Sequence, residues 1–309
     1  MKCILITGAT SFIGLNLLNY LLNDYKIIAV VRPNSQKLEN LPVNVNLSVA
    51  ELNLEEYDKL PLIITENIYG FIHLAWNGTR GADRENIEIQ KLNYKYSISA
   101  LHSAAKLNAK IFMSAGSQAE YGLQNNIITE NTVPKPVTAY GKSKLKFYEY
   151  GMEFCKNNNI KFVEPRFFSL YGAGDYKGTL IMSILDKMLK NEPCDLTDCM
   201  QKWNFLNIKD AVTGMKLLLE GEQVKSGAYN FASNDTRELK SFLLEMKNIT
   251  NSKSILNFGA IPHNDSGKYG INPDIRKLLN TGWQPKISFE DGIRDLLVLR
   301  YSGCYNENF

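Results

Sequence analysis

The chain opens with a strand, a glycine turn and a helix in immediate succession. Residues 3–7 are a short apolar run, which predicts a buried parallel strand. Gly8 permits a sharp turn after it, and leucines then recur at helical spacing from Leu15. This arrangement delivers backbone N–H groups and a helix N-terminus to a pyrophosphate, so it predicts a dinucleotide site. The alternative is a tight turn that binds nothing.

The predicted dinucleotide site differs from the usual glycine pattern at one place. Gly14 lets the helix sit close to the sheet, but Ser11 stands where a middle glycine would be expected. The loop must therefore admit a small side chain there. The residues that we expect to contact the cofactor are Gly8, Ser11, Phe12, Ile13 and Gly14.

The second predicted strand, residues 26–31, is followed by Arg32. A dinucleotide fold normally has an acidic residue here, which accepts hydrogen bonds from the adenosine ribose. An arginine cannot accept such a bond, but it can pair with the 2′-phosphate of NADP. Arg32 therefore favours NADP(H) over NAD(H). The alternative is an exposed arginine that stacks on the adenine of NAD.

Strand-like and helical segments alternate through the first half of the chain. Strands are expected near residues 2–7, 26–31, 44–49, 70–74, 110–114 and 161–165. Long helices are expected near residues 84–107 and 138–157. Such alternation predicts an α/β fold with a Rossmann-type doubly wound parallel sheet and helices on both faces.

The alternation ends after Gly172, where mixed helices, short strands and turns follow. We expect residues 1–165 to form the dinucleotide-binding domain and residues 166–309 to form mostly a smaller mixed α/β substrate lobe. Residues 203–220 are expected to return to the first domain, as one strand of its sheet and a helix.

Composition excludes several classes of protein. A chain of 309 residues with 44% hydrophobic content can bury a doubly wound sheet and a second lobe. Its 35 basic and 32 acidic residues give a net charge of +3, which does not call for nucleic acid. No apolar run approaches the ~18 residues of a membrane span, and the opening run is too short for a signal peptide.

The cysteines predict a reducing compartment and no metal site. The 5 cysteines are scattered and odd in number, without a paired framework, which fits the cytoplasm. Cys194 and Cys199 have no histidine or second cysteine pair nearby, so a zinc site is not expected.

Tyr140 and Lys144 lie four residues apart in a predicted helix and so share one face. A neighbouring ammonium favours the phenolate and lowers the pKa of the tyrosine, which suits a proton donor working near neutral pH. The alternative is an ordinary solvated helix face.

Taken in order, these motifs resemble the extended short-chain dehydrogenase/reductase family, in its NAD(P)-dependent nucleotide-sugar epimerase, dehydratase and 4-ketoreductase branch. The resemblance covers nearly all of the 309 residues. It is carried by the Thr-Gly-x-x-x-x-x-Gly loop from Thr7, by residues 73–76, Asn93, residues 114–122, the Tyr140-x-x-x-Lys144 pair and residues 165–172. It implies a nucleotide-diphosphate sugar substrate and a homodimer formed through the two long helices.

The resemblance also assigns roles to individual residues. Ser117 matches the family's catalytic Ser/Thr, which bonds the sugar oxygen that gains or loses charge. Tyr140 matches the residue that transfers the proton, and Lys144 the one that holds the nicotinamide ribose and keeps the tyrosine acidic. Leu74 and Ala75 are implied to line the cofactor through backbone contacts. The implied substrate contacts are Ser117, Gln118, Ser169 and Trp203.

Two departures from the family's patterns bear on the reaction. Sugar 4,6-dehydratases place Asp-Glu directly after the catalytic Ser/Thr, whereas this chain has Gln118 and Ala119. Because alanine cannot move a proton, dehydratase chemistry is disfavoured. Glu120, one residue further on, is expected to point away from the sheet edge. Ser169 replaces an asparagine that often touches the sugar.

The residues that hold the substrate diphosphate are left open. Relatives have an arginine near position 203, but here Trp203 stands beside Lys202. A second arginine is usual within residues 261–267, which contain none, so His263 and Lys268 are the candidate substitutes. The nucleotide, whether CDP, dTDP, GDP or UDP, is therefore undetermined.

Three functions are compatible with these residues. The first is an NADPH-dependent reductase of a nucleotide-linked 4-keto-6-deoxy sugar, since residues 194–210 resemble bacterial enzymes that make deoxy sugars for surface polysaccharide. The second is a C4 epimerase that keeps one NAD tightly bound, and an oxidising dehydrogenase is a minor variant. The third is a non-catalytic dinucleotide-binding protein, against which intact Ser117, Tyr140 and Lys144 argue.

Overall fold

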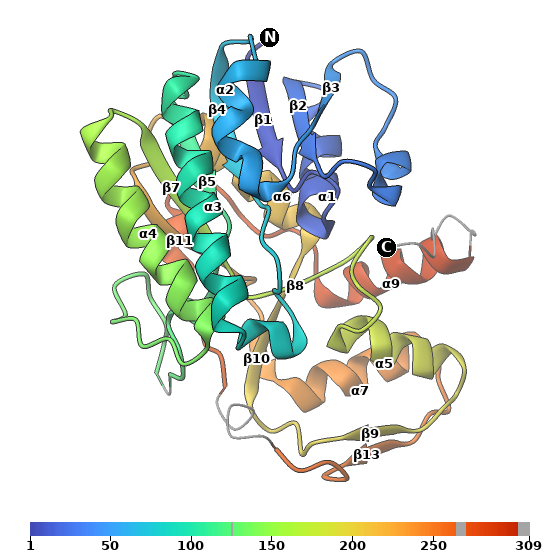
Figure 1. Cartoon of the computed structure of the whole chain (residues 1–309). Coiled ribbons are helices and arrows are strands. Elements are labelled where there is room, and N and C mark those ends of the chain that lie inside the picture. Colours follow the sequence, from blue (N-terminus) through green and yellow to red (C-terminus); the bar gives the residue numbers. More distant parts are fainter. Residues whose placement is uncertain (125, 264–269, 302–309) are drawn as a thin grey trace.

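The structure, a computed structural model, describes the whole chain except residues 125, 264–269 and 302–309. A central parallel sheet carries helices on both faces, and a smaller lobe lies at one end of it (Figure 1). This arrangement confirms the predicted doubly wound α/β fold.

The central sheet has the strand order β11-β7-β5-β4-β1-β2-β3, and every neighbouring pair is parallel. Its strands are β1 (Cys3–Thr7), β2 (Lys26–Val31), β3 (Leu47–Glu51), β4 (Ile68–His73), β5 (Ile111–Ser114), β7 (Lys161–Phe167) and β11 (Gly227–Phe231). The two-residue strand β6 (Gly116–Ser117) also pairs with β7. The order reverses between β1 and β4, and ligands of such sheets bind outside the carboxyl ends of the strands at this point.

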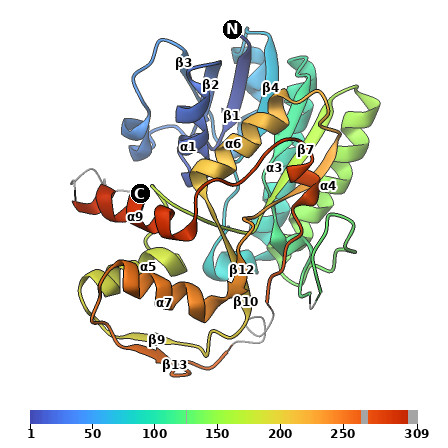
Figure 2. The ribbon, with the colours of Figure 1, turned by 180° about the vertical axis from the view of Figure 1, so that it is seen from behind.

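Apolar residues on both faces of the central sheet pack against the two helix layers. In β1, Ile4 and Ile6 belong to one hydrophobic core and Leu5 to the other, as expected for side chains that alternate along a strand. The first core includes helices α1 (Phe12–Leu21) and α6 (Ile208–Glu220). The second lies under α2 (Leu60–Ile63), α3 (Ile87–Lys106) and α4 (Ala139–Asn157). Helices α3 and α4 pack side by side in front of the sheet in Figure 1. Figure 2, seen from behind, shows α1 and α6 on the opposite face of the sheet.

The smaller lobe has its own core. One sheet has the order β12-β10-β8, and a second pairs β13 with β9. These strands are β8 (Ser169–Tyr171), β9 (Cys194–Leu196), β10 (Lys202–Asn207), β12 (Thr236–Glu238) and β13 (Leu256–Phe258). The lobe's helices are α5 (Leu180–Leu189), α7 (Leu239–Ile249) and α9 (Phe289–Tyr301), while the short α8 (Arg276–Leu279) packs against β11. Among the helices of the described residues, none is long and apolar enough to cross a membrane.

The prediction for residues 203–220 is wrong for its strand. β10 pairs with β8 and β12 instead of joining the central sheet, because β8 continues the chain just after β7 and offers its free edge. The helix of this segment, α6, does return and packs on α1. The strand that extends the central sheet is β11, which was not predicted because its sequence, Gly-Ala-Tyr-Asn-Phe, is no continuous apolar run.

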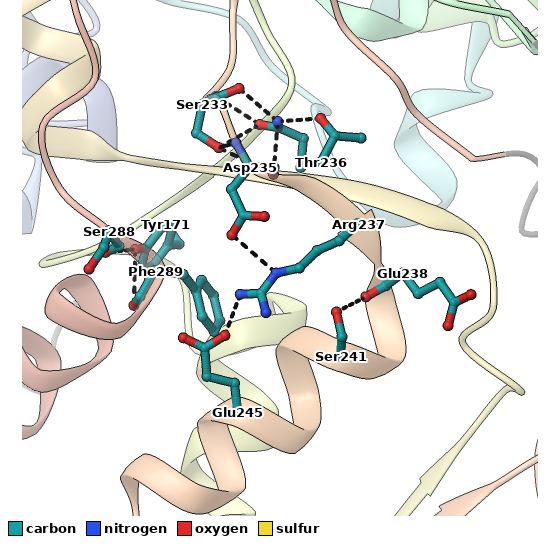
Figure 3. Close-up of polar contacts among 11 residues, drawn as sticks. Tyr171, Ser233, Asp235, Thr236, Arg237, Glu238, Ser241, Glu245, Ser288 and Phe289 are labelled. Atoms are coloured by element: carbon teal, nitrogen blue, oxygen red, sulfur yellow. Dashed lines mark hydrogen bonds and ion pairs between the residues drawn. The ribbon is translucent and has the colours of Figure 1, made fainter.

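A charged cluster fixes helix α7 to the lobe sheet (Figure 3). Arg237 of β12 forms ion pairs with Asp235 and with Glu245 of α7, and its guanidinium lies 4.0 Å from the ring centre of Phe242. Arg237 also stands opposite Trp203 in the β10–β12 register. The cluster therefore supports the strand that carries Trp203.

Candidate active site

The glycine loop after β1 meets the loop after β4 at the point where the strand order reverses. Gly8 has φ +69°, and a Cβ there would lie 2.7 Å from the Ala75 nitrogen and 2.9 Å from the Leu74 carbonyl carbon. A Cβ on Gly14 would lie 2.2 Å from the Gly8 oxygen. Both glycines are thus required by close backbone approach, and the cradle that they leave fits the pyrophosphate of a dinucleotide at the start of α1.

Ser11 explains how this loop dispenses with its middle glycine. Its hydroxyl accepts a hydrogen bond from the Gly14 N–H at 3.1 Å and so caps helix α1. Serine is a preferred N-cap residue, because its oxygen satisfies an N–H group that has no partner within the helix. The departure from the glycine pattern is therefore a capping serine.

A small cavity of about 190 Å³ continues from this loop to the end of β2. Arg32 and Lys37 both line it, together with Gly8 and Ala75, and none of its lining residues is acidic. Lys37 lies in the short 3₁₀ turn Gln36–Asn40, which begins four residues after Arg32. Sequence analysis missed Lys37, although a second basic residue five positions after Arg32 was a signal that could have found it.

A larger cleft of about 900 Å³ lies between the carboxyl ends of the central strands and the smaller lobe. It brings most of the predicted site residues together. These are Ser11, Phe12, Ile13, Leu74, Ser117, Tyr140, Lys144, Ser169 and Trp203. Gly8, Arg32 and Ala75 line the smaller cavity instead, and Gly14 lines neither. Among the predicted substrate contacts Gln118 is the exception: it does not line the cleft, and its Oε1 is buried without a hydrogen-bond partner among the described residues.

Helix α4 begins directly against the turn that carries Ser117. Thr138 caps the helix by accepting a hydrogen bond from the Gly141 N–H at 3.0 Å. A Cβ on Gly141 would lie 2.4 Å from the Ala119 oxygen, so a glycine is needed for this approach. The same contact sets Tyr140, the preceding residue, beside Ser117.

The electrostatics of Tyr140 differ from the prediction. Burial raises the pKa of Tyr140 to about 12, although Arg84 and a hydrogen bond with Ser117 act to lower it. The expectation that Lys144 lowers this pKa below its ordinary value is therefore wrong. Lys144 instead donates to the Ala115 oxygen at 2.7 Å and lies 3.6 Å from the ring centre of Trp76.

Lys144 itself is in an apolar environment. Burial lowers its pKa to about 8, while Glu120 and Glu164 act to raise it. The cation packed on the ring of Tyr140 is Arg84, whose guanidinium carbon lies 4.6 Å from the ring centre, against 5.8 Å for the Lys144 ammonium. Arg84 was missed because it belongs to none of the motifs.

A buried group of charges lies behind Ser117. Glu120 points away from the cleft, as predicted, and its Oε1 accepts a hydrogen bond from the Ser117 N–H at 2.7 Å. Arg166 joins Glu120 at 2.9 Å and Glu164 at 3.1 Å, and all three residues are at most 2% exposed. Burial and the neighbouring Glu120 raise the pKa of Glu164 well above its usual range.

His73, at the end of β4, and Asn93, in helix α3, have structural roles. His73 makes hydrogen bonds through Nδ1 to Thr7 at 2.8 Å and through Nε2 to Ser97 at 2.9 Å. Burial lowers the pKa of His73 to about 3, so it is neutral at physiological pH. Asn93 binds both backbone groups of Asn77 and fixes the loop after β4.

Other candidate ligands are not assembled in the part of the chain that the structure describes. That part contains no group of three or more His, Cys, Asp or Glu residues that could hold a metal. His263 pairs with Asp198 at 2.6 Å and does not line the cleft. Lys268, the other substitute considered for the diphosphate, lies outside the described residues.

Comparisons with known proteins agree with this geometry. The sequence profile of the NAD dependent epimerase/dehydratase family matches residues 4–232. The chain is 29% identical over 308 residues to a CDP-abequose synthase of Salmonella muenchen, covering 97% of this chain and 98% of that one. It is 25% identical over 307 residues to a dTDP-4-dehydro-6-deoxyglucose reductase of Escherichia coli, covering 95% and 96%.

The fold is similar to that of solved structures. A UDP-glucose 4-epimerase of Thermotoga maritima superposes with a TM-score of 0.88 at 21% identity, over 98% of this chain and 100% of that one. With its glycine loop, its Ser117–Tyr140–Lys144 group and a profile match over residues 4–232, the chain belongs to the NAD dependent epimerase/dehydratase family of extended short-chain dehydrogenases/reductases and is an NAD(P)-dependent oxidoreductase.

Proposed function

We propose that the protein is an NADPH-dependent reductase of a nucleotide-linked 4-keto-6-deoxy sugar, acting in the synthesis of bacterial surface polysaccharide. The observation that carries this proposal is that one cleft holds Ser117, Tyr140 and Lys144 beside the start of α1. The names of two relatives, a CDP-abequose synthase and a dTDP-4-dehydro-6-deoxyglucose reductase, support the class of substrate.

The residues of the cleft divide the reduction among them. NADPH, when bound, supplies a hydride to C4 of the sugar. Ser117 donates a hydrogen bond to the C4 oxygen as negative charge develops there, and Tyr140 gives that oxygen its phenolic proton. Because the pKa of Tyr140 is raised to about 12, its side chain holds this proton at neutral pH. The Lys144 ammonium would hold the nicotinamide ribose.

The reductase is favoured over the epimerase by the cavity at the end of β2. Arg32 and Lys37 line it without an acidic residue, a combination that suits a 2′-phosphate and therefore NADP(H). A reductase consumes its cofactor and must exchange it at each turnover, whereas an epimerase regenerates NAD in place. Ala119 stands where a dehydratase needs an acid, which disfavours that reaction.

A C4 epimerase with tightly bound NAD is the second candidate, since the same three catalytic residues serve both reactions. A non-catalytic dinucleotide-binding protein would have no use for Ser117, Tyr140 and Lys144 together in one cleft. A homodimer through α3 and α4, a cytoplasmic location and a substrate lobe that begins at residue 166 stay predictions.

Mass spectrometry of the nucleotide released on denaturation separates the two enzyme candidates. NADP(H), or an empty protein that takes up NADPH reversibly, supports the reductase. NADPH consumption is then followed with CDP-, dTDP-, GDP- and UDP-linked 4-keto-6-deoxy sugars. Stoichiometric, tightly held NAD would overturn the proposal in favour of the epimerase.

A further inference from the structure

The loop between β4 and α3 puts two arginines into the large cleft. Arg80 and Arg84 both line it, and with Lys144 they are its only cations among the described residues. Asp175 is the single acidic lining residue. Its carboxylate is 2% exposed and already accepts hydrogen bonds from the Thr179 hydroxyl at 2.8 Å and the Tyr176 N–H at 2.7 Å. The cleft therefore has a surplus of positive charge.

Arg84 is a half-buried cation without a counter-charge. Its guanidinium donates to the Thr79 oxygen at 3.3 Å and packs on the ring of Tyr140, and no carboxylate of the described residues lies within ion-pair distance of it. A guanidinium has five N–H donors in a planar fork, so most of those of Arg84 remain free for a ligand. Partial burial of an unpaired charge is costly, and an anionic ligand would remove that cost.

Arg80 faces the same space from the side of the smaller lobe. Its guanidinium carbon lies 4.5 Å from the ring centre of Tyr176, and its nearest contact with Asp175 is 3.9 Å, which is too long for a hydrogen bond. Arg80 is thus held to residues 175–176, while Arg84 is held to Tyr140 of α4. An anion between the two guanidinium groups would join the lobe to the catalytic helix.

The cofactor's own phosphates do not account for these two arginines. The glycine loop and the start of α1 supply the pyrophosphate site, and Ser11, Phe12 and Ile13 line the large cleft as well. Among the described residues, however, the side-chain contacts of Arg80 and Arg84 are with Thr79, Tyr140 and residues 175–176 and not with the glycine loop. The two arginines are therefore available for an anion other than the cofactor pyrophosphate. Trp203 and Phe205 of β10 form another wall of the cleft, which has no cation among the described residues.

We propose that Arg80 and Arg84 form the site for the diphosphate of the nucleotide-sugar substrate. This inference rests on the proposed function for the identity of the substrate, but the site itself is tested without turnover. Two guanidinium forks match the oxygens of a diphosphate better than point charges would, because each can bind two oxygens at once. A nucleoside without phosphate gains nothing from them.

The test is calorimetric titration of the full-length protein with CDP, UDP, dTDP and GDP, and with the matching nucleosides. We expect at least one diphosphate to bind the wild type about 10- to 100-fold more tightly than its nucleoside, with an affinity that falls as salt rises. Arg84→Gln and Arg80→Gln should each reduce that preference about 10-fold or more. The matched control is Arg294→Gln, which removes a 58% exposed arginine from an ion pair on α9 and should bind as the wild type does.

The outcomes are distinct from those of the function assay. Unchanged diphosphate affinity in both arginine variants, or a wild type that binds no nucleoside diphosphate better than its nucleoside, overturns the site. If Arg84→Gln lowers kcat but leaves diphosphate affinity intact, Arg84 acts on Tyr140 and not on the diphosphate. Loss of diphosphate binding in the variants, with a wild type that reduces none of the 4-keto sugars, keeps the site and rejects the reductase.

Discussion

Replacing Arg166 by methionine tests how the buried charges behind Ser117 hold the site together. Arg166 is 2% exposed and is the cation between Glu120 and Glu164. Without it, two buried carboxyl groups face each other without a counter-charge. Removing one partner of a buried ion pair typically costs about 3–5 kcal/mol. We expect the free energy of unfolding of Arg166→Met to be lower than that of the wild type by this amount near neutral pH. Methionine fills part of the space but compensates no charge.

The pH dependence of this loss has a definite sign. The pKa of Glu164 is already raised above its ordinary value of 4.5, and Arg166 is the cation that acts to lower it. Without Arg166 this pKa rises further, so the folded state binds more protons than the unfolded state between about pH 4.5, where the unfolded Glu164 titrates, and the higher pKa of Glu164 in the folded variant. Stability then falls as pH rises. The difference between variant and wild type should be larger at about pH 8 than at about pH 5, where more of Glu164 is protonated.

Urea unfolding followed by circular dichroism, at several values between about pH 5 and pH 8, measures this difference. Comparing each variant with the wild type at the same pH cancels contributions from other titrating groups. The matched control is Arg294→Met, whose partner is Glu290 on the exposed face of α9, and it should cost no more than about 1 kcal/mol. A cost below about 1 kcal/mol for Arg166→Met at every pH would refute the reasoning.

Three further predictions concern Tyr140, the cofactor site after β2 and the buried His73. Tyr140→Phe should fold and bind cofactor but lose about 100-fold or more in kcat, measured by NADPH consumption, and substantial remaining activity would contradict its role as proton donor. Arg32→Glu should shift the ratio of kcat/KM from NADPH toward NADH by about 10-fold or more, and Lys37→Ala should do so in the same direction, whereas unchanged ratios would reject the 2′-phosphate site. His73 is neutral in the folded protein, where its pKa is lowered from 6.5 to about 3. The unfolded chain therefore takes up a proton that the folded protein does not, and the free energy of unfolding falls as pH drops from about 6.5 toward 3. His73→Asn should remove up to about 5 kcal/mol of this fall in the free energy of unfolding between about pH 6.5 and pH 3. An unchanged dependence of the free energy of unfolding on pH would show that His73 is not its source.

The part of the site that the sequence predicted is the part set by local geometry. Gly8 and Gly14 are fixed by close backbone approach within one strand–turn–helix unit, so their spacing alone was informative. Tyr140 and Lys144 share one helix face for the same kind of reason. Ser117 could be located only through the family's motif, since a serine in a loop has no distinctive pattern of its own.

What the sequence did not predict depends on how distant segments meet. Arg84 reaches Tyr140 because the loop after β4 folds over the start of α4, and no spacing within either segment reveals this contact. Lys37 comes to Arg32 through a 3₁₀ turn. The direction of the Lys144 ammonium, toward Ala115 and Trp76, was likewise set by packing across the cleft.

The sheet assignments failed for a related reason. β10 is a strand as predicted, but the edge that it joins is decided by where β8 leaves the central sheet. The five residues of β11 contain glycine and asparagine and become a strand only because β7 presents an open parallel edge. Strand formation by a short, mixed segment is determined by its neighbours.

The most direct test of the central claim is isotope transfer from the cofactor to the sugar. NADPH carrying deuterium at the nicotinamide C4, in each of its two stereochemical forms, is incubated with the protein and each of the four nucleotide-linked 4-keto-6-deoxy sugars. We expect one form to deliver one deuterium to C4 of one product, with one NADP⁺ formed per sugar reduced. Interconversion of C4 epimers by the protein without consumption of NADPH and without deuterium in the product would contradict it.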